Sequence, residues 1–267
     1  MVKKKTPANC HGESNKNGER IMKLEIEHVC IGRTGMMHIR KGIDNQDAFF
    51  YAQNGSLKFF GLADGQTGAK YGAQGGREAL AVLFESLRKR SIAELQHNSY
   101  QDELRYELMH GVRQKLAQLA QKYGVTAGEF ASTIVVLLLD SGTGVYMTLH
   151  LGDGMILAIS RENSEMGRTL LSRPENGITA QYTWFTTTDD ALLHLRISFG
   201  CAGRYKRIVL LTDGAYPLSH WNTGSLLTSG TPADLWTTLN QMKPEDDASC
   251  LLIDITPKLL QSDEKSA

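Results

Sequence analysis

The sequence predicts an α+β fold in which antiparallel strands outnumber helices. Short apolar runs bounded by turn residues recur along the chain and are typical of buried strands. Consecutive runs are joined by the turn Asn54-Gly55 and by the segment DSGTG at residues 140–144, and both favour β-hairpins. Helical periodicity marks residues 77–90, 101–122 and 231–242, which are therefore predicted to be helices.

The composition is that of an ordinary soluble globular protein. Of the 267 residues, 41% are hydrophobic and 22% are charged, and the formal net charge is zero. A neutral chain favours neither a long basic surface for nucleic acid nor a polybasic membrane contact. The longest apolar stretches, such as Ile134–Leu139, are too short to span a bilayer. We therefore expect a cytoplasmic protein, since no secretory signal opens the chain and its four cysteines are widely spaced.

The patterned part of the chain is long enough for one large domain. Residues 1–21 are polar and lack periodicity, so they are expected to form a disordered tail. We expect one domain over residues 22–257 and a polar C-terminal tail over residues 258–267. The first patterned segment begins at Met22, which makes a translation start at Met22 a hypothesis that mass spectrometry of the native protein would test.

The first predicted strands already place two carboxylates together. Residues 22–31 alternate apolar and polar side chains, as a half-exposed strand does. A loop is expected next, followed by a strand that opens at Asp47, the Asn54-Gly55 turn, and a strand that closes at Asp64. Because antiparallel pairing brings the start of one strand beside the end of the other, Asp47 and Asp64 should be neighbours.

The rest of the chain predicts two helices, a series of strands and a capped helix. The helix over residues 101–122 carries an apolar stripe formed by Leu104, Leu108, Val112, Leu116 and Leu119. Thr231 and Pro232 mark the start of the last helix. Residues 161–181 are polar and irregular, as expected of a surface excursion. Further strands are predicted over residues 132–139, 144–151, 155–160, 182–188, 192–200, 207–213 and 246–255.

Aspartates stand at the ends of several predicted strands. Three apolar runs end at Asp-Gly, namely Asp64-Gly65, Asp153-Gly154 and Asp213-Gly214. A single such event is most often a turn, so the recurrence is what carries the prediction. Asp246 and Asp247 introduce the last strand in the same way. Converging carboxylates repel and raise one another's pKa, and divalent cations relieve that conflict.

The cation that these residues favour is Mg²⁺ or Mn²⁺. Both ions take oxygen ligands and retain several waters, whereas zinc is disfavoured because no set of His and Cys accompanies the aspartates. Two such ions bridged by a carboxylate generate a hydroxide-like nucleophile and neutralise a phosphoryl group in transfer. Hydrolysis of a phosphate ester is the reaction that this pattern indicates.

Other candidate motifs favour packing over chemistry. The glycine-rich segment over residues 65–76 lacks the Lys-Ser/Thr ending of a phosphate-binding loop, so close helix packing is the better interpretation. Ser132 lacks a GxSxG context. His28 and His150 lie in predicted strands, whereas His38, near the predicted cleft, is the one histidine considered for proton transfer.

The order of six motifs, NQDAF, LADGQTG, FASTIVVLLL, HLGDG, LLTDGA and DDASCLLI, resembles the metal-dependent protein phosphatases of the 2C type. The resemblance runs from Met22 to Ile255 and is strongest to the bacterial branch with NQDA in its first motif. It implies a four-layer αββα sandwich, in which helices flank two antiparallel β-sheets and the metals lie in a cleft at one end.

The resemblance also implies roles for individual residues. Asp64 would bridge two cations, and Asp213 and Asp246 would complete the carboxylate set of the first; these three residues would carry catalysis. Asp153 resembles the aspartate that binds a third, weaker cation. Asp247 occupies the companion position of the last motif. The implied metal ligands are Asp47, Asp64, the Gly65 carbonyl, Asp153, Asp213 and Asp246.

The sequence departs from the family pattern at several positions. Gln46 stands where many relatives have Glu, and Gly42 stands where the phosphate-binding Arg is usual. Arg40 or Lys41 is the expected replacement for that Arg in substrate binding. Gln66 stands where some relatives have a His, and HLGDGM replaces the usual GDSR, which retains the aspartate and loses a nearby Arg.

The function implied is that of a Mg²⁺- or Mn²⁺-dependent phosphatase acting on phosphoserine or phosphothreonine of proteins through a metal-activated water. Its partners would be phosphoprotein substrates and a cognate Ser/Thr kinase where one exists, and we expect a monomer that takes part in signalling. Two alternatives stay open: a catalytically silent metal-binding module that senses or scaffolds phosphoproteins, and a small-molecule phosphatase. Residues 161–181 would be the family's variable flap beside the cleft.

Overall fold

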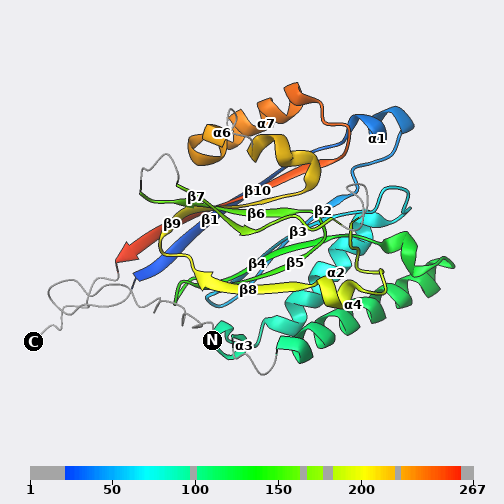
Figure 1. The fold of residues 1–267 in the computed structure, drawn as a ribbon, viewed down its shortest axis with the longest axis horizontal. Coiled ribbons are helices and arrows are strands. Elements are labelled where there is room, and N and C mark those ends of the chain that lie inside the picture. The colour runs from blue at the N-terminus through cyan, green and yellow to red at the C-terminus, as the bar shows by residue number, and fades with distance from the viewer. Residues whose placement is uncertain (1–21, 97–100, 163–166, 177–182, 220–223, 260–267) are drawn as a thin grey trace, which may run out of the picture.

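The computed structural model describes residues 22–96, 101–162, 167–176, 183–219 and 224–259. Two five-stranded antiparallel sheets pack face to face, and helices cover the outer face of each (Figure 1). The predicted four-layer αββα sandwich is therefore confirmed. The tail predicted over residues 1–21 lies outside the described residues. Of the tail predicted over residues 258–267, residues 258 and 259 end the last strand, and the others lie outside the described residues.

Each sheet is assembled from strands that are distant in the sequence. In order across the first sheet, the strands are β1 (Met22–Arg33), β10 (Ala248–Leu259), β9 (Tyr205–Leu211), β6 (Met155–Ser160) and β7 (Arg168–Ser172). In order across the second sheet, they are β2 (Asp47–Asn54), β3 (Leu57–Asp64), β4 (Ile134–Asp140), β5 (Val145–Leu151) and β8 (Arg196–Cys201).

The helices divide between the two outer faces (Figure 1). On the second sheet lie α2 (Gly72–Leu87), α3 (Ile92–Leu95), α4 (Gln101–Tyr123), η2 (Ala127–Phe130) and α5 (Ala191–His194). On the first sheet lie η3 (Asp213–Ser219), α6 (Gly224–Ser229) and α7 (Pro232–Met242). The short helix α1 (Met36–Lys41) follows β1. None of the helices in the described part of the chain combines the length and the hydropathy that a membrane-spanning segment needs.

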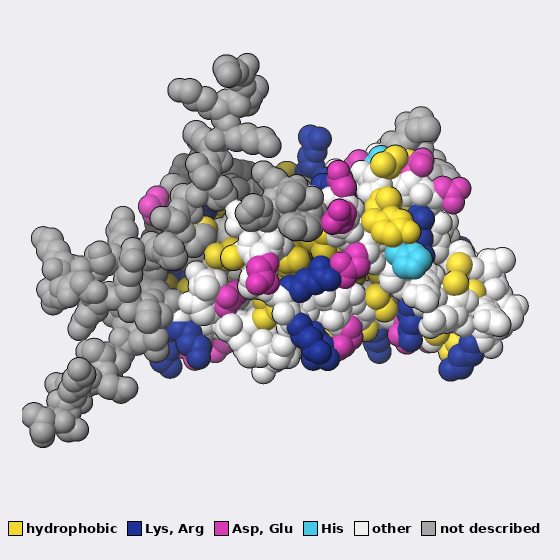
Figure 2. All heavy atoms as spheres, turned by 90° about the horizontal axis from the view of Figure 1, so that it is seen from below, with side chains coloured by type: hydrophobic (Ala, Val, Ile, Leu, Met, Phe, Trp, Pro, Cys, Tyr) yellow, Lys and Arg dark blue, Asp and Glu magenta, His cyan; other side chains and the backbone are white. Residues whose placement is uncertain are grey.

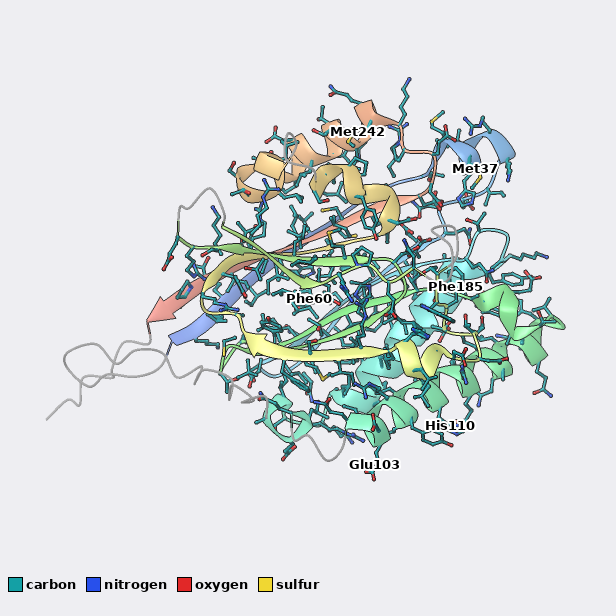
Figure 3. The ribbon with its side chains drawn as sticks, in the orientation of Figure 1. Met37, Phe60, Glu103, His110, Phe185 and Met242 are labelled. Carbon is teal, nitrogen blue, oxygen red and sulfur yellow. The ribbon has the colours of Figure 1, made fainter. Side chains whose placement is uncertain are left out.

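The central strands are apolar on both faces because both faces are covered. Along β4, Ile134, Val136 and Leu138 pack toward the helices, whereas Val135 and Leu137 pack into the space between the sheets. Phe60 fills the same inter-sheet layer (Figure 3). A strand buried on both sides loses the polar-apolar alternation of a half-exposed strand. This explains why these segments are continuous apolar runs in the sequence.

The hairpin and helix predictions are confirmed. The Asn54-Gly55 turn joins β2 to β3 with Gly55 at φ +60°, and the register pairs Asp47 with Asp64. All five apolar residues predicted as the stripe of α4 are buried. Thr231 and Asp234 form a reciprocal capping box at the start of α7.

Four local predictions are wrong. The strand predicted over residues 192–200 begins only at Arg196, because the residues before it form helix α5. The segment before Asp47 contains helix α1, which begins where the Met36 and Met37 amides donate to backbone carbonyls of residues 244 and 245. Residues 161–181, predicted to be irregular, contain β7, which pairs with β6. Residues 183–188 form no strand: Thr183 makes an isolated bridge with Asn176, and a turn begins at residue 186. There the Thr188 hydroxyl accepts from a backbone N–H of its own turn, and the Thr186 hydroxyl accepts from Ser132 N–H, so both hydroxyls replace ladder partners.

Candidate metal centre

Five predicted site aspartates meet at one end of the sandwich. Asp47 opens β2 and Asp64 closes β3, while Asp153 follows β5, Asp213 follows β9 and Asp246 precedes β10. The Asp64 carboxyl experiences the charges of all the other four. Both sheets contribute strand ends to this cluster, which we call the carboxylate cluster. The structure thus brings together residues that are up to 200 positions apart in the sequence.

Backbone contacts fix Asp64 in place. Thr133 Oγ1 accepts from Asp64 N–H at 2.9 Å, and Thr133 N–H donates to the Asp64 carbonyl at 2.8 Å. Gly65 N–H donates to the Gln46 carbonyl at 3.1 Å. Ser132 forms an isolated bridge with Gly65. Residues 132 and 133 therefore hold the end of β3, which agrees with the packing role expected of this motif.

Two glycines of the Asp-Gly pairs are required by close backbone approach. A Cβ on Gly65 would lie 2.7 Å from Gly72 Cα, at the start of α2. A Cβ on Gly214 would lie 2.2 Å from the Asp247 carbonyl oxygen. No side chain fits at such distances. These glycines let the first turn of α2 and the segment before β10 pass directly beside the aspartates.

Burial and mutual repulsion raise the pKa values of the carboxylate cluster. Burial is the largest cause for Asp64, whose pKa lies well above its usual range, and the charges of the other four add to it. The pKa of Asp47 is raised to about 7 and that of Asp153 to about 6, in both cases chiefly by burial. Burial and the neighbouring Asp246 raise the pKa of Asp213. Without a cation, these groups resist full ionisation near neutral pH.

The residues present fit a divalent cation. The Oδ1 atoms of Asp47 and Asp213 are buried and have no hydrogen-bond partner among the described residues. The Asp64 and Asp213 carboxyl groups are close enough for each to act on the pKa of the other, and a proton or a cation relieves the repulsion between two such carboxylates. Oxygen-only ligands suit Mg²⁺ and Mn²⁺.

The side chains of the carboxylate cluster are not arranged as a closed ligand shell. Among the described residues, no three His, Cys, Asp or Glu side chains close around one point as a finished ligand set would. The features of the cluster that favour a cation are its charge, its burial and its unpaired carboxylate oxygens.

Asp247 and His38 form a buried anchor beside the cluster. His38 Nδ1 lies 2.8 Å from Asp247 Oδ2, and both side chains are almost fully buried. Asp247 also accepts from Gly35 N–H at 2.7 Å and from Gln46 N–H at 2.5 Å. Because its carboxylate is occupied by these three donors, Asp247 ties α1 and the start of β2 to β10.

Gln46 caps a helix. Its Oε1 lies 3.4 Å from Ala73 N in the first turn of α2, and its Nε2 donates to the Asp44 carbonyl at 3.0 Å. The Gln46 side chain thus serves one of the free N–H groups at the start of α2. This accounts structurally for the residue that replaces the family's usual Glu.

The basic residues predicted to contact substrate lie on α1. Arg40 and Lys41 are both exposed, and the Arg40 guanidinium pairs with the exposed Glu245 carboxylate. That pairing raises the pKa of Arg40. Arg40 is therefore linked to the segment that carries Asp246, because Glu245 directly precedes that residue.

Tyr216 is a site residue that the sequence did not reveal. It lies in η3, three positions after Asp213, and its hydroxyl is buried without a hydrogen-bond partner among the described residues. Its pKa is raised by burial and then by the charges of Asp153, Asp213 and Asp64. A tyrosine after an Asp-Gly turn carries no distinctive pattern, so only the fold shows that it faces the aspartates.

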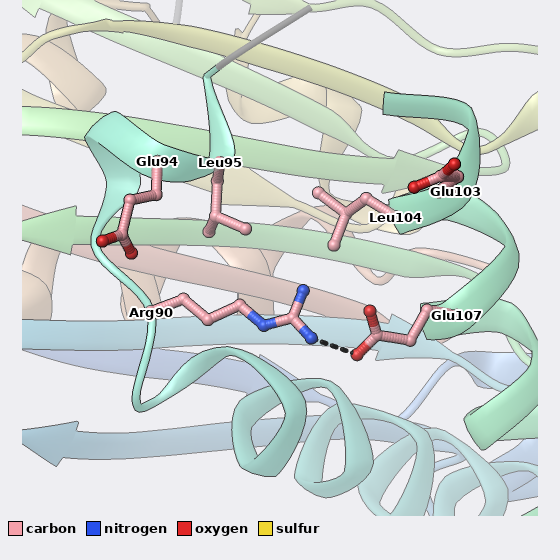
Figure 4. A pocket seen from close by; sticks show the side chains of 6 residues that line it. All are labelled: Arg90, Glu94, Leu95, Glu103, Leu104 and Glu107. Carbon is pink, nitrogen blue, oxygen red and sulfur yellow. Dashed lines mark hydrogen bonds and ion pairs between the residues drawn. The ribbon is translucent and has the colours of Figure 1, made fainter. Parts of the chain in front are cut away.

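The outer helical layer on the second sheet carries charges of both signs, unlike the carboxylate cluster. Basic and acidic side chains are interspersed over the α3 and α4 layer (Figure 2). A hollow of about 240 Å³ lies there, lined by Arg90, Glu94, Leu95, Glu103, Leu104 and Glu107, with Arg90 paired to Glu107 (Figure 4). None of these residues belongs to the carboxylate cluster.

Comparison with known proteins yields one family and a consistent set of structures. The sequence model of the family described as "Protein phosphatase 2C" matches residues 34–252. No curated protein matches the sequence significantly.

Three solved structures illustrate the structural likeness. A bacterial serine phosphatase superposes with a TM-score of 0.64 at 17% identity, covering 88% of this chain and 100% of its own. The serine/threonine phosphatase Stp1 from Staphylococcus aureus gives 0.63 at 16%, covering 87% and 96%. The S. agalactiae serine/threonine phosphatase gives 0.65 at 15%, covering 87% and 100%.

Proposed function

Because the chain belongs to the protein phosphatase 2C family, we propose that it is a Mg²⁺- or Mn²⁺-dependent phosphatase that hydrolyses phosphoserine and phosphothreonine in proteins. The observation that carries this proposal is the carboxylate cluster. Its five aspartates come from both sheets, and the charges of the other four all raise the pKa of Asp64. Such a cluster is stable near neutral pH only with compensating positive charge.

The proposed ligands divide by position. Asp64 would bridge two cations, and the Gly65 carbonyl would contact one of them. Asp213 and Asp246 would complete the carboxylate set of the first ion, and Asp153 would serve a third ion. When bound, these cations would act as Lewis acids toward the phosphoryl group and lower the pKa of an attacking water. Asp47 would stay close to the metals, oriented by Thr212 Oγ1, which donates to Asp47 Oδ2 at 3.0 Å.

The basic residues of α1 would bind the substrate. Arg40 is exposed on α1 and would hold the phosphate by charge-assisted hydrogen bonds, with Lys41 beside it on the same short helix. The contact between Arg40 and Glu245 is exposed, so exchanging that carboxylate for a phosphate costs little. Phosphoprotein substrates, a cognate kinase, a monomeric state, a cytoplasmic location and membership of the NQDA branch belong to the same proposal.

The test is metal-dependent hydrolysis of a phosphothreonine peptide by the intact chain. We expect turnover with Mn²⁺ or Mg²⁺ and none after chelation. Asp213→Asn should reduce kcat on the order of a hundredfold or more, because a metal site supplies several kcal/mol of transition-state stabilisation. Asp189→Asn is the matched control, since Asp189 is exposed and stands outside the cluster.

The outcomes separate the candidate functions. Mn²⁺ binding without turnover by the wild-type chain would reject the enzyme and favour a silent binding module. Turnover of small phosphomonoesters with no activity on phosphopeptides would reject the protein substrate.

A further inference from the structure

A polar cluster lies at the edge of the second sheet, next to Asp153. Glu175, in the segment after β7, accepts from His194 Nδ1 at 2.8 Å through Oε1. Its Oε2 lies 3.1 Å from Arg196 Nε, an ionic contact without hydrogen-bond alignment. The three side chains are only 25–30% exposed. We call Glu175, His194 and Arg196 the Glu175 hub.

The Arg196 guanidinium is held from several sides. Its Nη2 donates to the Arg173 carbonyl at 2.6 Å and to His150 Nδ1 at 3.0 Å. Since Arg is always a donor, His150 Nδ1 must accept, which makes this buried imidazole neutral. Burial and the Arg196 charge accordingly lower the pKa of His150 to about 3. Arg196 is therefore a fixed cation to which Glu175 is tethered.

The backbone of Glu175 connects the hub to the turn that carries Asp153. Glu175 N–H donates to the Gly152 carbonyl at 3.0 Å. Thr183 Oγ1 donates to the Glu175 carbonyl at 3.2 Å, and it also lies within reach of the Asp153 carboxylate, so the single hydroxyl proton has two neighbouring acceptors. Glu175 therefore holds the peptide before Asp153 directly, and it holds in place the hydroxyl that neighbours the Asp153 carboxylate.

The turn itself depends on these contacts. Asp153 lies between β5 and β6, outside the ladder hydrogen bonds of both strands. Gly152 has φ +101°, and a Cβ there would lie 2.7 Å from Thr133 Cγ2 and 3.0 Å from the Trp184 carbonyl oxygen. The Trp184 ring stacks on His194 with centroids 3.7 Å apart. Trp184 therefore packs against the turn through its backbone and against His194 of the hub through its ring.

We propose that Glu175 is a positioning residue that fixes the Asp153 carboxylate for the weakest of the cation sites. It does so by anchoring residues 175 and 183 to the His194 and Arg196 side chains. The inference rests on the proposed function, because Asp153 needs a defined position only as a ligand. Groups that orient metal ligands typically change metal affinity by 10- to 100-fold when they are removed.

The experiment is a calorimetric Mn²⁺ titration of the metal-stripped full chain. Glu175→Ala should weaken the step that Asp153→Asn removes, by about tenfold, and should leave the tighter steps unchanged. Glu175→Gln retains an oxygen for His194 and should lose less. Adding Glu175→Ala to Asp153→Asn should have no further effect on Mn²⁺ binding. Asp254→Ala, which breaks the ion pair with Arg207 on the first sheet, is the control for general destabilisation.

The results distinguish this inference from the proposed function. A Glu175→Ala isotherm identical to the wild type overturns the positioning role, as does an equal loss in every step or an equal loss in Asp254→Ala. An unchanged isotherm for Asp153→Asn also overturns it. If the wild type binds Mn²⁺ in these steps without hydrolysing phosphopeptide, the proposed function fails and the positioning role of Glu175 stands.

Discussion

Asp64 occupies the most demanding position of the carboxylate cluster. It is half-buried, its pKa is raised by desolvation and by all four neighbouring aspartates, and its backbone is held by Thr133. Asp153 lies at the edge of the same cluster, in a turn, and its pKa is raised only to about 6. In the proposed site, Asp64 would contact two cations, whereas Asp153 would contact one.

Asp64→Ala should abolish phosphatase activity more completely than Asp153→Ala. Loss of the proposed bridging ligand removes contacts to two cations, so kcat should fall on the order of a hundredfold or more, whereas loss of Asp153 affects one weaker ion. Steady-state hydrolysis of a phosphopeptide at saturating Mn²⁺ measures both. Equal losses would show that the ranking of the ligands is wrong.

The metal-free chain should be less stable at pH 8 than at pH 5. The pKa values of Asp47 and Asp153 are raised to about 7 and about 6 in the folded chain. The folded state therefore holds these protons more tightly than the unfolded state, and their stabilising contribution is lost as pH rises through 6 and 7. Thermal unfolding of the chelated wild type and of Asp47→Asn gives the difference. If the stability of the wild type relative to Asp47→Asn increased with pH, the raised pKa of Asp47 would be contradicted.

At the scale of elements, the strands were predictable and several connections were not. The hairpin that pairs Asp47 with Asp64 follows from Asn54-Gly55, and the buried strands follow from their apolar runs. Helix α1 has only six residues, too few for periodicity to show. Its position depends on Asp247, some 200 residues later, which local sequence cannot reveal. β7 was missed because it is only five residues long, with two leucines between polar residues, and it lies at a sheet edge, paired on one side.

Asp247→Ala should destabilise the fold much more than a surface change. It removes the partner of His38 and of two backbone N–H groups, and breaking a buried pair of this kind costs about 3–5 kcal/mol. Chemical denaturation measures the free energy of unfolding. Asp102→Ala is the control, because the Asp102 carboxylate in its pair with Arg105 is 97% exposed and such pairs contribute little. Similar losses in both variants would contradict the anchoring role.

At the scale of the whole molecule, the carboxylate cluster joins the two sheets. Asp47, Asp64 and Asp153 come from the second sheet, whereas Asp213 and Asp246 adjoin strands of the first. The sequence predicted which aspartates would meet, because their motif order matched a family with this sandwich. It did not reveal Tyr216 or the Glu175 hub, since both act through packing between elements that are distant in the sequence.

Divalent cations should therefore stabilise the whole fold. Ligands that bind only the folded state add about 2.7 kcal/mol at a hundredfold excess over Kd, so Mn²⁺ should raise the unfolding temperature and chelation should lower it. Differential scanning calorimetry with and without Mn²⁺ measures the shift, and Asp213→Asn should reduce it. An unfolding temperature independent of Mn²⁺ in the wild type would contradict a cation held between the sheets.

The central claim is that these five aspartates hold divalent cations. A crystal of the full chain soaked in Mn²⁺, with anomalous scattering recorded at the manganese absorption edge, tests it most directly. We predict anomalous peaks coordinated by the Asp64 carboxylate, with Asp213, Asp246 and the Gly65 carbonyl around them. A well-ordered soaked crystal with no peak at Asp64, or with peaks only elsewhere on the molecule, would contradict the claim.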